Sequence, residues 1–254
     1  MSGSVEERLA KEAAFQNKRM EAAHEGEIEA RDRFYYLAAR AMERYHERIA
    51  SGPGDRVVVV GCSEGGVQQH AKGGAVVTGI DIADEAVSRL NEELAAAGWS
   101  NADARVMNAE ALEVPPRSVD LICCSGVLHH LDVPRAIASW AAALKPNGRV
   151  VMIEPMAYNP LIAAYRKLTP SMRTDDEHPL IPRDFAAMER HFRTVAVEPF
   201  VLTSMLSLPL SLVWPRARDR VLPALERLDD ALTARLAALR YLCWTAVIEL
   251  ADPR

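Results

Sequence analysis

Five short apolar runs alternate with helical stretches between residues 55 and 155, and this rhythm constrains the fold more than any other feature. The runs are "RVVVVG", "AVVTGID", "ARVMNA", "VDLICCSG" and "GRVVMIEP". Between them, "EAVSRLNEELAAAG" and "VPRAIASWAAALKPNG" predict helices, the second ending at Pro146 and Gly148. Continuous apolar strands that are separated by single helices form parallel sheets covered on both faces, so the sequence predicts a doubly wound α/β domain.

The rest of the chain predicts further elements of both kinds. "TVAVEPF" (194–200) and "YLCWTAVIEL" (241–250) predict two more strands, with helix between them. Residues 4–50 contain strong helix formers and no proline, and "SGPG" (51–54) is expected to end that helix. We therefore divide the chain into an N-terminal helical cap, 1–52, and a main domain, 53–254, with lid insertions over the ligand edge at about 156–193 and 201–240.

Composition and charge narrow the function classes. The 254 residues are 49% apolar and 26% charged, which is typical of a globular protein. A formal net charge of −5 argues against a protein that grips nucleic-acid phosphates. No apolar segment resembling a signal peptide follows Met1. The mixed-sign charges before residue 33 predict a solvated helix face.

Two further features bear on location. The four cysteines are Cys62, Cys123, Cys124 and Cys243. Three of them lie in apolar strand-like runs and are interpreted as small buried hydrophobes rather than metal ligands or disulfides, which fits a reducing cytoplasm. The run 200–214 is apolar, but it is too short to span a bilayer and Pro209 interrupts it. It predicts a buried or pocket-lining helix, and the alternative is peripheral contact with a membrane surface or a lipid-like substrate.

The loop "VVVVGCSEGG" (57–66) allows three interpretations. As G-x-S-x-G it would expose a hydrolase serine, and as a degenerate G-x-G-x-x-G it would bind a dinucleotide. The third is the looser glycine loop that receives S-adenosylmethionine. A serine hydrolase is disfavoured because the loop follows the first strand, so no earlier strand supplies an oxyanion loop, and no histidine follows His191.

Two acidic residues distinguish the remaining interpretations. Asp81 follows Gly61 by twenty residues at the end of the next strand, where a carboxylate can accept the ribose hydroxyls of either NAD or S-adenosylmethionine. Glu64 would put a negative charge beside a pyrophosphate, which is unfavourable. A methionyl sulfonium carries no phosphate and tolerates a nearby carboxylate. The loop therefore favours S-adenosylmethionine.

Five ordered motifs resemble the class I S-adenosylmethionine-dependent methyltransferases of the small-molecule type. They are "VVVVGCSEGG", "GIDIADEAV", "MNAEAL", "VDLICCSGVLHHLDVP" and "ALKPNGRVVMIEP", over roughly residues 54–155. The resemblance implies a Rossmann-like seven-stranded sheet with an antiparallel last strand and S-adenosyl-L-methionine as cofactor. It assigns cofactor binding to Gly61, Cys62, Ser63, Gly65, Asp81, Ile82, Asn108, Ala109, Ser125 and Tyr36. The family usually has an acidic residue at Val59 and glycine at Ser63.

Residues near the predicted ligand edge are candidates for the acceptor side. A general base is needed only where the acceptor must lose a proton, and His129 and His130 are the candidates for it. Tyr35 could form a lid together with Tyr36, or the two could simply pack on the sheet. Further substrate candidates are Glu154, Tyr158, Arg173 and His178. No metal is expected, because Glu177 and His178 lack partners at ligand spacing.

The sequence thus predicts an enzyme that transfers a methyl group from S-adenosylmethionine to a small, largely hydrophobic acceptor. A quinone-like, lipid-like or secondary-metabolite acceptor is expected, without nucleic acid, for a monomer or homodimer. Two alternatives stay open. One is a protein that uses S-adenosylmethionine unconventionally, as a cyclase or a non-catalytic partner. The other is an NAD-dependent oxidoreductase.

Overall fold

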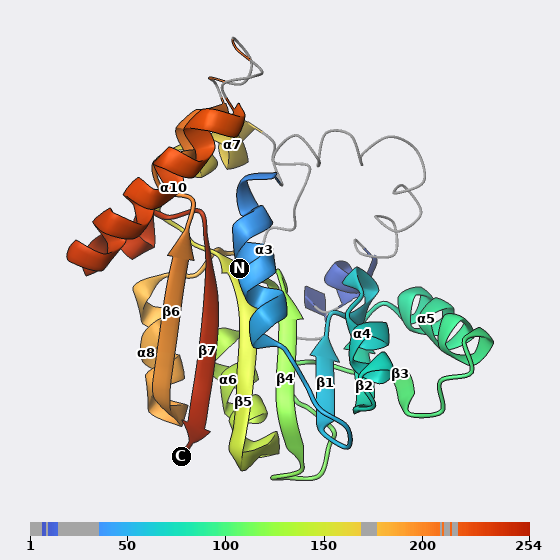
Figure 1. Cartoon of the computed structure of the whole chain (residues 1–254). Coiled ribbons are helices and arrows are strands. Elements are labelled where there is room, and N and C mark those ends of the chain that lie inside the picture. The colour runs from blue at the N-terminus through green and yellow to red at the C-terminus, as the bar shows by residue number, and fades with distance from the viewer. Residues whose placement is uncertain are drawn as a thin grey trace.

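A seven-stranded sheet forms the centre of the computed structural model, which describes residues 7–8, 10–14, 36–168, 177–208, 210, 214 and 218–254 (Figure 1). The strands are β1 (Arg56–Val60), β2 (Val76–Asp81), β3 (Ala102–Val106), β4 (Val119–Ser125), β5 (Leu144–Pro155), β6 (Phe192–Phe200) and β7 (Thr245–Pro253). Their order across the sheet is β3-β2-β1-β4-β5-β7-β6. Strand β7 pairs antiparallel with both neighbours, and the other pairings are parallel. The predicted doubly wound sheet with an antiparallel last strand is confirmed.

Helices cover the two faces of this sheet. The α-helices are α3 (Ala39–Arg48), α4 (Val67–Lys72), α5 (Asp84–Ala96), α6 (Val133–Ala143), α7 (Pro160–Leu168), α8 (Pro182–His191) and α10 (Arg218–Arg235). Short 3₁₀ helices are η1 (Tyr36–Ala38), η2 (Cys62–Glu64), η3 (Leu128–His130), η5 (Ser204–Leu206) and η7 (Ala237–Leu242). In Figure 1, α3 and α4 lie in front of the sheet, and α6 and α8 lie behind it.

Strand β1 shows why both faces need covering. Its side chains alternate, so that Val58 and Val60 join a core with Trp140 of α6 and Phe185 of α8. Val57 and Val59 join the opposite core, which includes residues of α3, α4 and α5. Because both faces of β1 are buried, every position of the strand is apolar after Arg56.

The parallel register brings several strand ends to one edge. Val60 pairs with Ile80 of β2 and with Cys124 of β4, so the next residues of all three strands lie together. The chain order reverses between β1 and β4, where neighbouring connections leave toward opposite faces. Doubly wound sheets bind ligands at such a switch point, outside the carboxyl ends of the strands.

Three predicted boundaries differ from the structure. Helix α6 ends at Ala143 rather than at Pro146, because a residue that precedes proline disfavours helical backbone. Strand β3 begins at Ala102, two residues earlier than "ARVMNA", where it pairs with Val77. Strand β7 begins only at Thr245, because its partners β5 and β6 end there, and η7 occupies the residues before it.

The helices of the two predicted insertions lie at different places on the sheet (Figure 1). Helices α7 and α10 lie beyond the carboxyl ends of the sheet strands (Figure 1). Helix α8 instead packs on the sheet face, where Phe185 and Met188 are buried in the core beside α6. The apolar run 200–214 differs in burial from residue to residue: Met205 is buried, whereas Leu206 and Trp214 are exposed. No helix among the described residues is long and apolar enough to cross a membrane.

Candidate functional site

An open cavity lies at the carboxyl ends of β1 to β4. Its walls come from each of these strand ends, from η3 and from the N-terminal segment: Glu12, Val60, Gly61, Ser63, Ile80, Asp81, Ile82, Met107, Ala109, Gly126, Val127, His130 and Leu131. Five of the predicted cofactor residues are among them, namely Gly61, Ser63, Asp81, Ile82 and Ala109. The sheet therefore gathers residues that are far apart in the sequence around one space.

Gly61 begins the loop that follows β1, and it cannot be replaced without strain. Its φ is +74°, and an added Cβ would lie 2.4 Å from Cγ2 of Val127. Its N–H donates to the Ile80 carbonyl at 2.9 Å, which holds the loop against the end of β2. The absence of a side chain lets the loops after β1 and β4 approach each other at the cavity.

Ser63 and Asp81 are joined across the same wall. The Ser63 backbone N–H donates to Oδ2 of Asp81 at 3.2 Å, and Oδ1 accepts the Ala83 N–H at 3.0 Å. Ser63 lies in η2 and is not among the residues with positive φ, so serine fits where the family usually has glycine. Gly65 and Gly66 take the positive φ values instead.

Other predicted cofactor residues lie near the cavity without lining it. Oδ1 of Asn108 accepts the Glu110 N–H at 2.9 Å, while Met107 and Ala109 on either side of it face the cavity. Ser125 is the last residue of β4, one position before Gly126 in the wall. The Cys62 side chain is buried in the core, and its burial raises the pKa of the thiol to about 12. All four cysteines are buried and unbridged.

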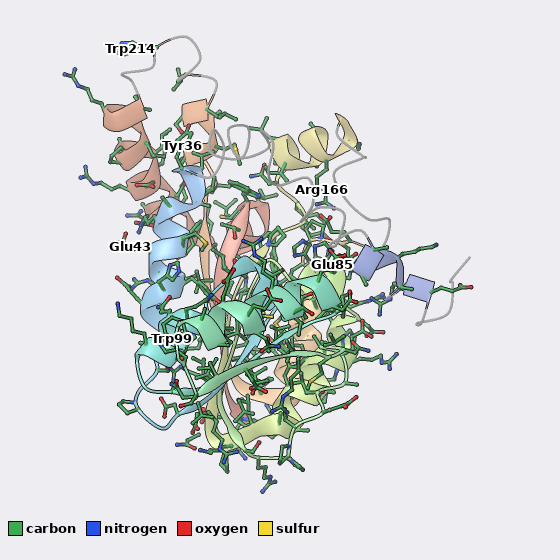
Figure 2. All side chains as sticks on the ribbon, turned by 90° about the vertical axis from the view of Figure 1, so that its right-hand side faces the viewer. Tyr36, Glu43, Glu85, Trp99, Arg166 and Trp214 are labelled. Carbon is green, nitrogen blue, oxygen red and sulfur yellow. The ribbon has the colours of Figure 1, made fainter. Side chains whose placement is uncertain are left out.

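Tyr36 lies apart from the cavity wall. Its hydroxyl is 3.1 Å from the Ser207 hydroxyl, and its partly buried side chain packs against the hydrophobic core. Figure 2 shows Tyr36 and Arg166 at separate places in the upper part of the molecule. Tyr35, its predicted companion in a lid, lies outside the described residues.

His129 is held from behind by Glu154, the predicted substrate residue at the end of β5. Glu154 is fully buried, and its Oε2 lies 2.7 Å from Nδ1 of His129. Its Oε1 accepts the N–H groups of Val127 at 2.9 Å and Leu128 at 2.8 Å. Burial raises the pKa of the Glu154 carboxyl, but His129 and these N–H groups outweigh burial and lower it overall. Glu154 is therefore ionised and holds η3 in place through these contacts. The His129 ring lies over it and is itself slightly exposed.

His130, unlike His129, lines the cavity. Its ring centroid lies 4.2 Å from that of His129, and its Nδ1 lies 3.2 Å from Oε1 of Glu12 without hydrogen-bond alignment. Burial lowers the pKa of His130, but Glu12 and the nearby Glu177 and Glu154 outweigh it and raise the pKa overall. Three carboxylates, those of Glu12, Glu154 and Glu177, thus lie close to the two imidazoles.

Glu177 approaches the histidine pair from another part of the chain. Its Oε1 lies 3.8 Å from Nε2 of His129 and 2.5 Å from Nη1 of Arg166 in α7. The adjacent His178 donates its backbone N–H to the His129 carbonyl at 2.9 Å. Of the other predicted substrate residues, Tyr158 is largely exposed and Arg173 lies outside the described residues.

The N-terminal segment contributes charged residues that the sequence did not predict. Arg8 forms an ion pair with the buried Glu110 and donates to the His130 carbonyl at 3.2 Å. The Glu12 side chain is only 12% exposed and lines the cavity. The prediction of a solvated helix face was therefore wrong for these two residues. Their side chains are covered by contacts with distant parts of the chain, which the local sequence pattern of charges does not reveal.

Comparisons with known proteins relate this chain to methyltransferases. Residues 58–152 match a family model that is described as a methyltransferase domain. A ubiquinone biosynthesis O-methyltransferase of Nitrosomonas europaea is 32% identical over 119 residues, which are 46% of this chain and 50% of that protein. The aklanonic acid methyltransferase DauC of Streptomyces sp. is 32% identical over 42% of this chain and 49% of that protein. The chain thus spans about half the length of these relatives.

A solved structure shows the same fold at lower identity. It is a phosphoethanolamine N-methyltransferase of Haemonchus contortus in complex with S-adenosyl-L-methionine. The two share 15% identity and a TM-score of 0.60, over 87% of this chain and 56% of that one. At this identity the likeness concerns the fold.

Proposed function

We propose that this chain, whose residues 58–152 form a class I S-adenosylmethionine-dependent methyltransferase domain, transfers the methyl group of S-adenosylmethionine to a small, largely hydrophobic acceptor. The observation that carries the proposal is the cavity at the switch point of the sheet, with Gly61 and Asp81 in its wall. The named relatives methylate small molecules, which supports the same class of acceptor here.

The chain's own residues fit the cofactor. Asp81 is 9% exposed at the cavity, and each of its oxygens accepts one backbone N–H, which leaves lone pairs for ribose hydroxyls. The apolar side chains of Ile82, Met107 and Leu131 suit an adenine ring. Bound S-adenosylmethionine supplies a methyl group that its sulfonium already activates. The protein mainly has to align an acceptor with that group and exclude water.

The acceptor side is assigned to η3. His130 is in the cavity wall, and the buried Glu154 orients His129 directly behind it. A hydroxyl acceptor has to lose its proton on the way to the product, and this histidine pair is the proposed place for that proton. Replacing either histidine should then lower turnover by about 10²–10⁴-fold while cofactor affinity stays nearly unchanged.

Calorimetric titration with S-adenosylhomocysteine tests the cofactor assignment. We expect saturable binding that Asp81→Ala weakens at least about tenfold, since two hydrogen bonds to a charged acceptor are lost. The matched control is Asp103→Ala; this partly exposed carboxylate on β3 pairs with Arg105 and accepts the Thr78 hydroxyl. Binding of NADH without a response to S-adenosylhomocysteine would favour the oxidoreductase alternative instead.

A screen with methyl-labelled S-adenosylmethionine tests the acceptor class. Label should pass to small apolar metabolites and not to bulk RNA or DNA. If the cofactor binds but label passes to no acceptor, the alternative of a protein that uses S-adenosylmethionine unconventionally gains support. Label in nucleic acid at physiological salt would contradict the proposed substrate class.

A further inference from the structure

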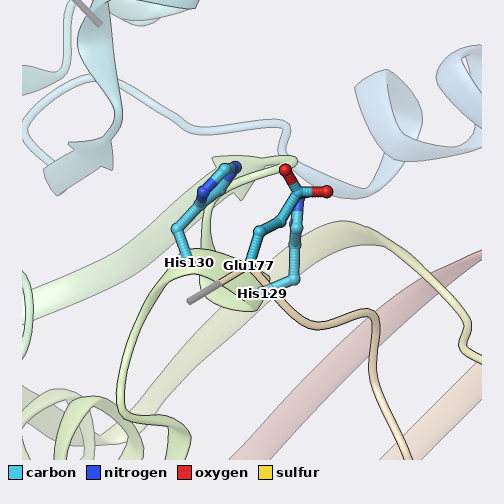
Figure 3. A group of neighbouring side chains, drawn as sticks. All are labelled: His129, His130 and Glu177. Atoms are coloured by element: carbon cyan, nitrogen blue, oxygen red, sulfur yellow. The ribbon is translucent and has the colours of Figure 1, made fainter. Parts of the chain in front are cut away.

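Three side chains from two distant segments converge beside the cavity (Figure 3). His129 and His130 belong to η3, and Glu177 lies some fifty residues further along the chain. One ring nitrogen of each histidine and one carboxylate oxygen of Glu177 all lie within 4.8 Å of one another. Ligands about 2.0–2.2 Å from a tetrahedral ion are about 3.3–3.6 Å apart, so small side-chain movements would complete the geometry.

A buried carboxylate orients the first of these ligands. Glu154 engages Nδ1 of His129, which leaves Nε2 directed toward Glu177. Histidines that bind metals commonly donate their other ring N–H to a carboxylate, which fixes the tautomer and makes the ligating nitrogen more basic. Glu12 lies beside Nδ1 of His130 at 3.2 Å and gives that ring a carboxylate neighbour as well.

We propose that His129, His130 and Glu177 bind a divalent transition-metal ion beside the cavity. Two imidazole nitrogens and one carboxylate oxygen form a donor set that suits Zn²⁺ and its first-row neighbours better than Mg²⁺ or Ca²⁺. From the sequence we expected no metal, because Glu177 and His178 lacked partners at ligand spacing. The fold supplies those partners from η3, and Glu177 rather than His178 faces them.

Arg166 is the competitor that the ion has to accommodate. Its Nη1 lies 2.5 Å from Oε1 of Glu177, and its Nη2 donates to the Glu177 carbonyl at 3.4 Å. The same Oε1 that Arg166 holds also faces Nε2 of His129, so the carboxylate has to rotate to give one oxygen to the ion while Arg166 keeps the other. Its positive charge nevertheless opposes a cation, so removing it should strengthen metal binding.

The position of the site suggests a role, which, unlike metal binding itself, rests on the proposed methyl transfer. Three protein ligands leave a fourth position on a tetrahedral ion, and His130 lines the cavity that would receive the acceptor. An acceptor hydroxyl at that position would release its proton to solvent more readily, because a bound cation stabilises the oxyanion. In the metal-bound form the two histidines hold the ion, so they orient the acceptor and do not themselves take up the proton.

Metal titration of the full chain tests the site without any acceptor. The protein is treated with a chelator, exchanged into buffer and titrated with ZnCl₂ by calorimetry, and CoCl₂ serves as the spectroscopic probe. We expect one saturable Zn²⁺ per chain and visible absorption typical of tetrahedral Co²⁺. Glu177→Gln should weaken Zn²⁺ binding at least about tenfold, Arg166→Gln should strengthen it, and the exposed Glu43→Gln should leave it unchanged.

Several outcomes would overturn the metal site. The first is that the unmodified protein shows no saturable Zn²⁺ binding. The second is that Glu177→Gln and Glu43→Gln bind Zn²⁺ with equal affinity. Melting curves of each variant verify folding, and the unmodified protein alone already decides the first outcome. S-adenosylhomocysteine binding is measured on the same samples. Intact cofactor binding without Zn²⁺ binding overturns only the metal site, and the reverse result overturns only the proposed function.

Discussion

At the residue scale, His70 in α4 is a buried imidazole that is not among the residues lining the cavity. It is 2% exposed, with Nδ1 2.7 Å from the Ser51 hydroxyl and Nε2 3.6 Å from Sγ of Cys123. Burial lowers the pKa of His70 below its ordinary value of 6.5. Since the unfolded chain binds this proton more readily, the contribution of His70 to stability is fully present above about pH 6.5. It is lost as the pH falls toward the folded-state pKa.

Replacing His70 should therefore remove a pH dependence. We expect the difference in unfolding free energy between the unmodified protein and His70→Gln to shrink from pH 7.5 to 5.5, by up to about 1.4 kcal/mol per pH unit within the titration window. Urea unfolding at several pH values measures it, with the exposed His46→Gln as control. A difference that stays constant over this range would contradict the assignment.

At the scale of elements, Asp229 in α10 fastens the start of the second insertion. It is 4% exposed and accepts the N–H groups of Leu202, Thr203 and Ser204 at 2.6–3.2 Å. It also accepts a hydrogen bond from the hydroxyl of Thr203 and another from the hydroxyl of Ser204. One buried carboxylate thus joins α10 to η5 and satisfies donors that would otherwise be buried without partners.

Asp229→Ala should destabilise the protein by about 2–5 kcal/mol, because it leaves several buried donors unpaired. The adjacent Asp230 is a matched control, since its side chain is 51% exposed and pairs with Arg40 on the surface. Asp230→Ala should cost no more than about 1 kcal/mol. Urea unfolding compares the two variants, and equal losses would contradict the proposed role of Asp229.

At the scale of the whole molecule, the cavity wall is made of β1 to β4 together with η3 and the N-terminal segment. A ligand that spans this wall binds the folded chain only. S-adenosylhomocysteine at a hundred times its Kd should therefore stabilise the fold by about 2.7 kcal/mol. For a chain of this size we expect Tm to rise by about 5–10 °C.

Thermal melts with and without ligand measure this stabilisation. Asp81→Ala should lose most of the shift at the same ligand concentration, whereas Glu43→Gln on α3 should keep it. A shift of this size with NADH, and none with S-adenosylhomocysteine, would contradict the cofactor assignment.

The sequence by itself determined the sheet and several residues of the cavity where we propose that the cofactor binds. Strands such as 57–60 are buried on both faces, so their apolar runs are visible without a structure, and the positions of Gly61 and Asp81 follow from where the strands end. The sequence predicted where strands and helices begin and end less accurately than it predicted which elements exist. The start of β7 depends on where its partners β5 and β6 stop, which no local pattern encodes.

Only the tertiary structure decided which residues surround the histidine pair, where we propose that the acceptor binds. Glu12 and Glu177 reach the histidine pair from segments more than a hundred and about fifty residues away, respectively, and neither lies in a periodic pattern. Glu154 was predicted near the substrate, yet its burial makes it the anchor of His129 instead. A charged side chain carries the same local signal whether it is solvated or paired. Its role is therefore set by the distant residues that the fold brings against it.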